Sequence, residues 1–376
     1  MIKTAYITLL TIVACIGVGC GSSGEVDPTR FANEDYTPKH ATGFSISTDN
    51  EGNSLLRVTR PWQGEEVAEQ QLAIFNSEEA ARGYRGEYII GHAERIICMS
   101  TSYVAMLDEL SMTQCIAGVS GKQYVMNEEV RQNPNICDVG YDTNLDFESM
   151  LLSEADLVIL YGVTAENNAL TAKLKELSIP YIYFGDYTEQ SPLGKAEWLV
   201  AMSEIVGCRE RGEELFRAIE ERYEAVLHNV KPSTERRKVM LNLPYQDVWY
   251  MPADDSYLVR LIYDAGGDYV FKGRSPHSGS KGISLEEAIE LVAEADIWLN
   301  VGQCTTLDEI GSVAPLFAQM EVVKRGEVYN NNRRRSADGG SDFWESAIVR
   351  PDVVLNDLVR IMQGRSDSLY YHHKLK

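Results

Sequence analysis

The sequence lacks the short motifs that mark common hydrolases and nucleotide-binding enzymes. It contains no GxSxG nucleophile motif, no GxxxxGK[ST] phosphate loop and no HExxH helix. Histidine is scarce, with six among 376 residues, and only His372 and His373 are adjacent. Sites for bare zinc or manganese ions use clustered histidines with carboxylates, so no metal site of this kind is expected. These absences predict a protein that is not an enzyme and has no resident cofactor.

Positive charge is also in short supply. The chain has 35 Lys and Arg residues against 56 Asp and Glu residues, which gives a net charge of −21. Such a surface repels phosphate backbones, so nucleic acid is excluded as a partner. Two alternatives to simple binding stay open, namely a hydrolase with an unrecognised site and ligation of a haem iron by His277 or a tyrosine.

Paired cysteine motifs are absent. Of the seven cysteines, five follow the N-terminal apolar segment, and none of them forms a CxxC pair. Cys98 and Cys115 lie in apolar runs, which predicts buried thiols. A disulfide is permitted in an oxidising compartment, but the pattern does not specify one. The other three cysteines are Cys137, Cys208 and Cys304.

Long apolar runs are confined to the N-terminus. Tyr6 to Gly19 is almost wholly apolar or small, which is typical of a signal peptide and too short to span a bilayer comfortably. A small residue before Cys20 resembles the bacterial lipobox, so residues 1–20 are predicted to be a signal peptide with Cys20 lipidated. Cys15 is the alternative, because the letters before it fit the lipobox better. Residues 21–42 are then a flexible tether, and the mature protein is periplasmic and lipid-anchored to a cell membrane.

Two different patterns follow the tether. Residues 43–75 favour strands, with turn chemistry at Asp49 to Gly52. From Arg95 onwards, short apolar strands alternate with amphipathic helices, which predicts a parallel sheet flanked by helices. The strands are predicted at 96–99, 115–119, 157–160 and 181–184, and the helices at 100–110, 146–153 and 166–177.

Two helices separate this first α/β segment from a second one. Ser191 is a good N-cap and Pro192 suits the first helical position, so a helix is predicted to run from Leu193 to about Val206. A longer charged helix follows over residues 209–230.

A second α/β pattern begins after Pro232. Its strands are predicted at 239–242 and 297–300, and its helices at 257–265, 284–293 and 351–362. Residues 153–160 and 293–300 echo each other, because each has acidic residues leading into an apolar strand. The predicted fold class is therefore α/β, with two Rossmann-like lobes joined by a single long connecting helix and an extra N-terminal β-element. The predicted domains are an N-terminal lobe with its β-rich extension at 43–191, the connecting and following helices at 192–230, and a C-terminal lobe at 231–376.

Eight short segments follow one another along the chain in the order known from one protein family. They are 94–100, 118–120, 138–140, 155–158, 194–198, 342–345, 350–352 and 355–358. Through them the chain, from residue 88 to its end, resembles the periplasmic binding proteins for iron–siderophore complexes, haem and cobalamin, in which one rigid helix joins the lobes. Glu154-Ala155 replaces the Lys-Pro that is usual before the "PDLV" strand of that family, and residues 43–87 are not covered. The resemblance implies a monomeric binding protein that delivers its ligand to an ABC permease dimer with its ATPase.

The family also implies two sites for docking to the permease. Its members carry one exposed glutamate on each lobe, thought to meet arginine pockets on the two permease subunits. By position these match Glu148 and Glu286, with Glu287 as a competitor for the second. Carboxylates near helix N-termini are favoured by the helix dipole and pair well with arginine.

Ligand-binding residues are expected in the loops that follow strands. Tyrosine and tryptophan offer flat apolar faces with a polar tip, and a run of three arginines in so acidic a chain predicts an anion clamp. The expected ligand is a ferric siderophore, with cobalamin or haem as alternatives, and a surface lipoprotein that serves an outer-membrane receptor is the alternative role. The candidate residues are Ser102, Tyr124, Tyr187, Trp249, Tyr250, Tyr257, Arg333, Arg334 and Arg335.

Overall fold

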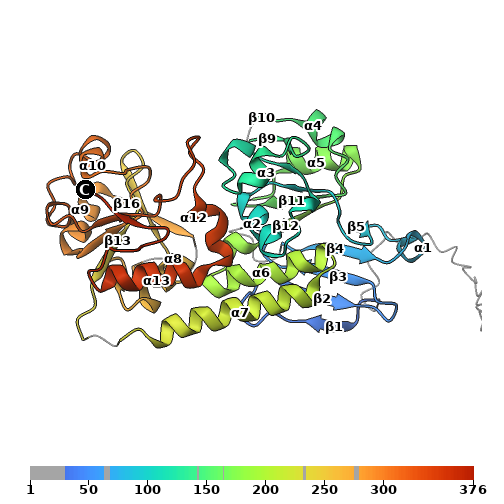
Figure 1. The fold of residues 1–376 in the computed structure, drawn as a ribbon, viewed down its shortest axis with the longest axis horizontal. Coiled ribbons are helices and arrows are strands. Elements are labelled where there is room, and N and C mark those ends of the chain that lie inside the picture. The colour runs from blue at the N-terminus through green and yellow to red at the C-terminus, as the bar shows by residue number, and fades with distance from the viewer. Residues whose placement is uncertain (1–29, 63–67, 142–143, 164, 232–233, 275–278) are drawn as a thin grey trace, which may run out of the picture.

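The computed structural model describes residues 30–62, 68–141, 144–163, 165–231, 234–274 and 279–376. Residues 1–29, which hold the predicted signal peptide with Cys15 and Cys20, lie outside these ranges, and so does His277. The described chain forms two α/β lobes set side by side above a pair of long helices (Figure 1). No helix in this part of the chain is long and apolar enough to cross a bilayer.

The N-terminal lobe contains a parallel five-stranded sheet in the order β12-β11-β6-β7-β8. Strands β6, β7, β11 and β12 are apolar runs that are buried on both faces apart from Tyr161, because helices cover the sheet, whereas the short strand β8 is only partly buried. Parallel strands end at the same edge of a sheet, and the loops after them gather there. The elements are β6 (Ile96–Cys98), α2 (Thr101–Glu109), β7 (Ile116–Val119), α3 (Glu128–Gln132), β8 (Cys137–Asp138), α4 (Phe147–Leu152), β11 (Leu157–Tyr161), α5 (Asn168–Leu177) and β12 (Tyr181–Phe184).

The C-terminal lobe repeats this plan in the order β15-β13-β17-β18-β19, with β19 antiparallel to its neighbour. A separate antiparallel pair, β14 (Val248–Pro252) and β16 (Ser280–Ser284), lies beside it. The remaining elements are β13 (Lys238–Leu241), α8 (Tyr257–Asp264), β15 (Asp268–Tyr269), α9 (Leu285–Glu294), β17 (Ile297–Leu299), α10 (Leu307–Val313), α11 (Glu321–Lys324), β18 (Val328–Asn330), α12 (Asp342–Glu345), α13 (Pro351–Met362) and β19 (His373–Lys374).

The sequence echo between the lobes corresponds to a repeated structural device. The carboxylate of Asp156, just before β11, accepts the backbone N–H of Glu94 at 2.8 Å, next to the start of β6. The carboxylate of Asp296, just before β17, accepts the N–H of Lys238 at 2.9 Å, at the start of β13. In each lobe an aspartate therefore fixes the relative positions of two neighbouring parallel strands. The two-lobed α/β fold predicted from the sequence is confirmed.

The N-terminal β-element forms a separate sheet in the order β1-β2-β3-β4-β5, drawn in blue in Figure 1. It lies against β12, the edge strand of the N-terminal lobe. Gln70 accepts the N–H of Tyr183 at 3.1 Å, and Glu87 accepts the N–H of Tyr181 at 3.4 Å. The β-element thus provides hydrogen-bond acceptors for backbone N–H groups of the edge strand β12, which would otherwise be free to pair with another chain. Its elements are β1 (Asn33–Tyr36), β2 (Phe44–Thr48), β3 (Ser54–Val58), β4 (Gln70–Phe75), α1 (Glu78–Ala81) and β5 (Glu87–Ile90).

The predicted tether over 21–42 is wrong in its second half. Residues 33–36 are strand β1, and the segment that follows is held against the connecting helices by buried carboxylates. Glu197 accepts the N–H groups of His40 and Ala41, both at 2.7 Å. The polar composition of 33–42 favours a solvated segment, but the backbone N–H groups of His40 and Ala41 have a buried partner far along the sequence.

The connection between the lobes is made by one helix, but by α7 (Arg209–His228) and not by the predicted helix over Leu193 to Val206. That shorter helix, α6 (Pro192–Ile205), is buried on nearly every side, as expected for a helix that is apolar all round. α7 begins beside the N-terminal lobe, where Arg209 pairs with Asp35 at 2.6 Å. It ends under the C-terminal lobe, where Tyr223 donates to Asp264 at 2.8 Å (Figure 1).

Candidate functional site

A cleft with two adjoining compartments lies between the lobes. The polar compartment has a cavity volume of about 300 Å³, and the apolar compartment has one of about 420 Å³. Residues from both lobes line each of them. Both compartments share the side chains of Tyr141, Tyr161 and Trp344, together with Ser100 and Thr101 at the start of α2. The two compartments therefore form one continuous cleft.

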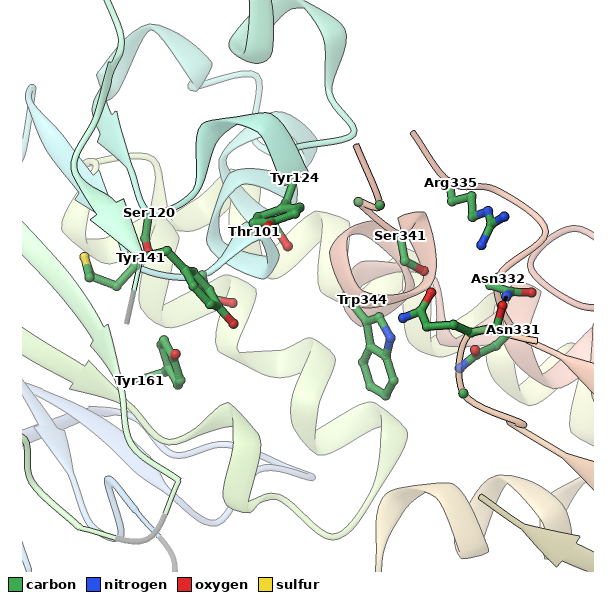
Figure 2. A pocket seen from close by; sticks show the side chains of 16 residues that line it. Thr101, Ser120, Tyr124, Tyr141, Tyr161, Asn331, Asn332, Arg335, Ser341 and Trp344 are labelled. Carbon is green, nitrogen blue, oxygen red and sulfur yellow. Dashed lines mark hydrogen bonds between the residues drawn. The ribbon is translucent and has the colours of Figure 1, made fainter. Parts of the chain in front are cut away.

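On the side of the N-terminal lobe, tyrosines form the wall of the polar compartment, as Figure 2 shows. Tyr161 is the last residue of β11, so its side chain stands at the edge where the parallel strands end. Tyr124 ends the 3-10 helix η2 (Lys122–Tyr124) after β7, and Tyr141 ends the short strand β9 (Gly140–Tyr141) after β8. Their rings pack edge to face with centroids 5.9 Å apart. The three side chains are 38%, 55% and 41% exposed for Tyr124, Tyr141 and Tyr161. Their ring faces are thus available to a ligand.

The opposite side of the polar compartment belongs to the C-terminal lobe, and we call it the C-terminal wall. It comes from the loop after β18. Asn331, Asn332, Arg335 and Ser341 lie on it and face the tyrosines across the cleft (Figure 2). Asn332 is held in place, because its amide donates to the carbonyls of Gln303 and Cys304 at 3.3 and 3.2 Å. Trp344, on α12, closes the wall with 57% of its surface exposed.

The apolar compartment has a buried ion pair at its floor. The Lys195 ammonium lies 3.6 Å from an Asp186 carboxylate oxygen and 4.8 Å from the centre of the Tyr257 ring. Burial raises the pKa of the Asp186 carboxyl, although Lys195 and the Tyr103 hydroxyl oppose this rise. Burial also raises the pKa of Tyr257 well above its usual range, so its hydroxyl stays neutral. The floor therefore presents one ammonium group among aromatic rings.

Five of the nine predicted ligand-binding residues line the cleft. Tyr124 and Arg335 lie in the polar compartment, and Ser102, Tyr187 and Tyr257 in the apolar one. Five further lining residues were not predicted from the sequence, namely Tyr141, Tyr161, Lys195, Asn331 and Trp344. The sequence pattern could have indicated three of them. Tyr161 directly follows an apolar run, Asn331 lies just before the arginine run, and Trp344 lies in the segment 342–345 that resembles the family.

The other four predicted ligand-binding residues lie away from the cleft. Trp249 was a wrong assignment, because it is fully buried, packs against Trp298 with ring centres 5.5 Å apart and belongs to β14. Tyr250, on the same strand, is 48% exposed but lines neither compartment. The side chains of Arg333 and Arg334 are also directed elsewhere.

Only the third arginine of the run Arg333-Arg334-Arg335 reaches the cleft described here. Arg333 donates to the carbonyl of Leu369, and Arg334 pairs with Asp342 at 2.6 Å while its guanidinium lies over the Tyr370 ring. The anion clamp predicted from three arginines is thus reduced to one.

The two candidate docking carboxylates are both exposed. Glu148 lies in the first turn of α4 in the N-terminal lobe, and Glu286 lies in the first turn of α9 in the C-terminal lobe. Within the described chain, neither of them has an ion-pair partner. Glu287 is half-buried, which makes it the weaker candidate in α9.

Comparisons with known proteins agree with this architecture. Residues 96–332, more than half of the chain, match the family model described as periplasmic binding protein. A lipoprotein of Methanocaldococcus jannaschii is 25% identical, over 98% of this chain and 95% of that protein.

Two solved structures have the same fold. A periplasmic haem-binding protein from Pseudomonas aeruginosa has a TM-score of 0.55 at 15% identity, covering 75% of this chain and 98% of that one. The periplasmic vitamin B12-binding protein of Vibrio cholerae has a TM-score of 0.52 at 14% identity, covering 72% and 97%. With the match to the family model, the chain belongs to the periplasmic binding protein family.

Proposed function

We propose that the protein is the substrate-binding component of an ABC importer and that it captures a bulky metal chelate in the cleft between its lobes. The lining of the cleft carries this proposal. Five tyrosines and one tryptophan surround it, and its charged side chains are Lys195, Arg335 and Asp186. A lining with an excess of positive charge, in a chain of net charge −21, favours an anionic ligand.

A ferric siderophore is the ligand that we propose first. Aromatic rings with polar tips suit flat conjugated groups, and the two cations suit their acidic substituents. Haem and cobalamin are the alternatives, and the likeness in fold to a haem-binding and a vitamin B12-binding protein supports ligands of this size. The protein acts by binding and release, without turnover.

We further propose that the protein acts as a monomer, anchored to the membrane through a lipid on Cys20. The M. jannaschii relative is a lipoprotein and matches nearly the whole chain, which supports this anchoring. The partner is an ABC permease dimer with its ATPase, which Glu148 and Glu286 contact. Mass spectrometry of the mature N-terminus tests the anchor, and a mature chain that begins at Cys15 would contradict it.

Absorbance spectroscopy tests the ligand class. The protein is purified from cells fed separately with a ferric catecholate siderophore, haemin or cyanocobalamin. These ligands have distinct visible bands, so a retained band at stoichiometric amount identifies the class. Retention of none of them, together with measurable hydrolysis of an ester or glycoside, would overturn the proposal in favour of an enzyme.

A further inference from the structure

The C-terminal wall of the cleft contains polar groups that the fold itself leaves unused. Asn331 is 6% exposed, and no described residue hydrogen-bonds its side-chain Nδ2. The Ser341 hydroxyl is likewise buried without a hydrogen-bond partner in the described chain. Both residues line the polar compartment (Figure 2). A buried donor without an acceptor destabilises the folded protein, so we expect a ligand to provide the acceptor for this pair.

Arg335 lies in the same place as these two donors. Arg335 forms an isolated antiparallel β-bridge with Ser341, so the two residues lie directly opposite each other. Arg335 and Ser341 both line the polar compartment, and Arg335 has no ion pair among the described residues. A guanidinium, an amide N–H and a hydroxyl, all donors, therefore meet at one wall.

Building on the proposed function, we infer that Asn331, Ser341 and Arg335 form a subsite for an oxyanion of the ligand, such as a carboxylate or a phenolate. Hydrogen bonds between such donors and a charged oxygen are stronger than neutral ones. The subsite also orients the ligand, because its acidic group faces the C-terminal lobe while its flat apolar part lies between Trp344 and the opposing tyrosines. Asn332 is not part of it, since its own amide is used by the fold.

The neighbouring arginines supply a matched control for the test. Arg335→Met and Arg333→Met remove the same charge from the same loop, but the Arg333 guanidinium donates to the Leu369 carbonyl outside the cleft. Asn331→Asp keeps the size of the side chain and turns its donor into an acceptor. Tryptophan fluorescence follows binding, because Trp344 lies in the cleft, and circular dichroism confirms that each variant is folded.

The probes are ferric tris-catecholate and haemin, which are anionic, and cyanocobalamin, which is neutral overall. We expect Asn331→Asp and Arg335→Met to weaken binding of the best anionic probe about tenfold or more, and Arg333→Met to leave it unchanged. If all three variants bind that probe like wild type, or if cyanocobalamin binds best and the variants do not alter it, the oxyanion subsite is overturned and the capture of a chelate stands. If wild type binds none of the probes, the proposed function itself fails.

Discussion

At the scale of single residues, Glu345 joins the two lobes through a buried charge. It comes from α12 and is 3% exposed. Its two carboxylate oxygens accept the backbone N–H groups of Met126 and Asn127 in the N-terminal lobe, at 2.6 and 2.7 Å. Burial raises its pKa to about 7, with Asp342 and Asp108 adding to the rise and the two N–H groups opposing it. This contact is therefore sensitive to pH near neutrality.

We predict that Glu345 makes stability fall as the pH rises. A carboxyl whose pKa is raised from 4.5 to about 7 binds its proton more tightly in the folded protein than in the unfolded chain. The stabilisation from this proton is complete below pH 4.5 and is lost as the pH rises through 7. Glu345→Gln does not titrate. Wild type should therefore lose stability relative to this variant as the pH rises over this range. The difference between their free energies of unfolding should fall by roughly 3 kcal/mol at most. Urea unfolding at several pH values measures it, and a difference that is flat with pH would contradict the prediction.

The sequence could not show which single residues are buried, because burial depends on how distant parts of the chain pack. Tyr257 and Arg335 were predicted correctly to lie in the cleft, because they lie in or next to loops that follow strands. Trp249 has similar surroundings in the sequence, yet it is fully buried beside Trp298 and Phe317. Trp249 lies on β14, which pairs with β16 about thirty residues further along the chain. This pairing determines which side chains of β14 are buried, and the neighbouring sequence gives no indication of it.

At the scale of elements, the N-terminal β-element is attached to α6 by two buried glutamates. Glu197 is fully buried and accepts three backbone N–H groups, from Lys39, His40 and Ala41, at 2.7–2.8 Å. Glu189 accepts the N–H of Gly43 at 2.9 Å and the indole N–H of Trp198 at 3.0 Å. Glu197 thus binds the segment before β2 directly to α6, whereas Glu189, which precedes α6, links Gly43 to Trp198 of the helix.

We predict that Glu197→Gln loosens residues 36–43 and destabilises the protein. The amide retains one acceptor and brings two donors toward the N–H groups, so part of a buried network loses its partners. The free energy of unfolding should fall by roughly 3 kcal/mol, and the amides of residues 39–41 should exchange with solvent faster. Glu210→Gln, at an exposed position on α7, is the matched control and should change stability by less than about 0.5 kcal/mol. Equal stability of the two variants would show that this attachment is unimportant.

Element positions were largely predictable from the sequence, whereas their long-range contacts were not. The period of the apolar residues placed α2, α4 and α5 within about two residues of their observed bounds. The choice of α6 as the connector failed, because a Ser-Pro start marks a helix but says nothing of what the helix packs against. The charged, amphipathic α7 was the better candidate for a helix that runs along the outside of both lobes.

At the scale of the whole molecule, the two-lobed architecture followed from the alternation of strands and helices and from the echo between residues 153–160 and 293–300. One exposed glutamate on each lobe is then the expected contact with a two-subunit permease. We predict that Glu148→Ala and Glu286→Ala leave ligand affinity nearly unchanged, since neither residue lines the cleft. Uptake by cells should fall in each variant and fall most in the double variant. A collapse of ligand affinity would refute the assignment, and unimpaired uptake would favour a surface lipoprotein that serves an outer-membrane receptor.

We expect α7 to hold the lobes at a nearly fixed angle. This helix has 20 residues and is therefore about 30 Å long, and its hydrogen-bond ladder resists bending. Arg209 anchors its start to Asp35, and Tyr223 and Arg222 anchor its second half to Asp264 and Asp352 in the C-terminal lobe. At its contact with α6, a Cβ on Gly212 would lie 2.0 Å from Ser203 Oγ, so the two helices are closely packed. Connecting strands, by contrast, would bend easily about a few residues.

We therefore predict only a small rotation of the lobes when ligand binds. Small-angle scattering of the free and ligand-saturated protein should give nearly the same radius of gyration, and a large decrease would show that α7 does not fix the lobes. Gly194, in the first turn of α6, is closely packed, because a Cβ there would meet Ser191, the His40 carbonyl and Glu189 at 2.9–3.1 Å, and we therefore expect no hinge at this residue. Gly212→Ala should force α6 and α7 apart, lower stability by about 1–3 kcal/mol and change the scattering profile. Gly311→Ala, inside α10 and with its nearest atom 3.9 Å away, is the control. It should leave the scattering profile unchanged and raise stability by up to about 1 kcal/mol, because alanine favours a helix more than glycine does.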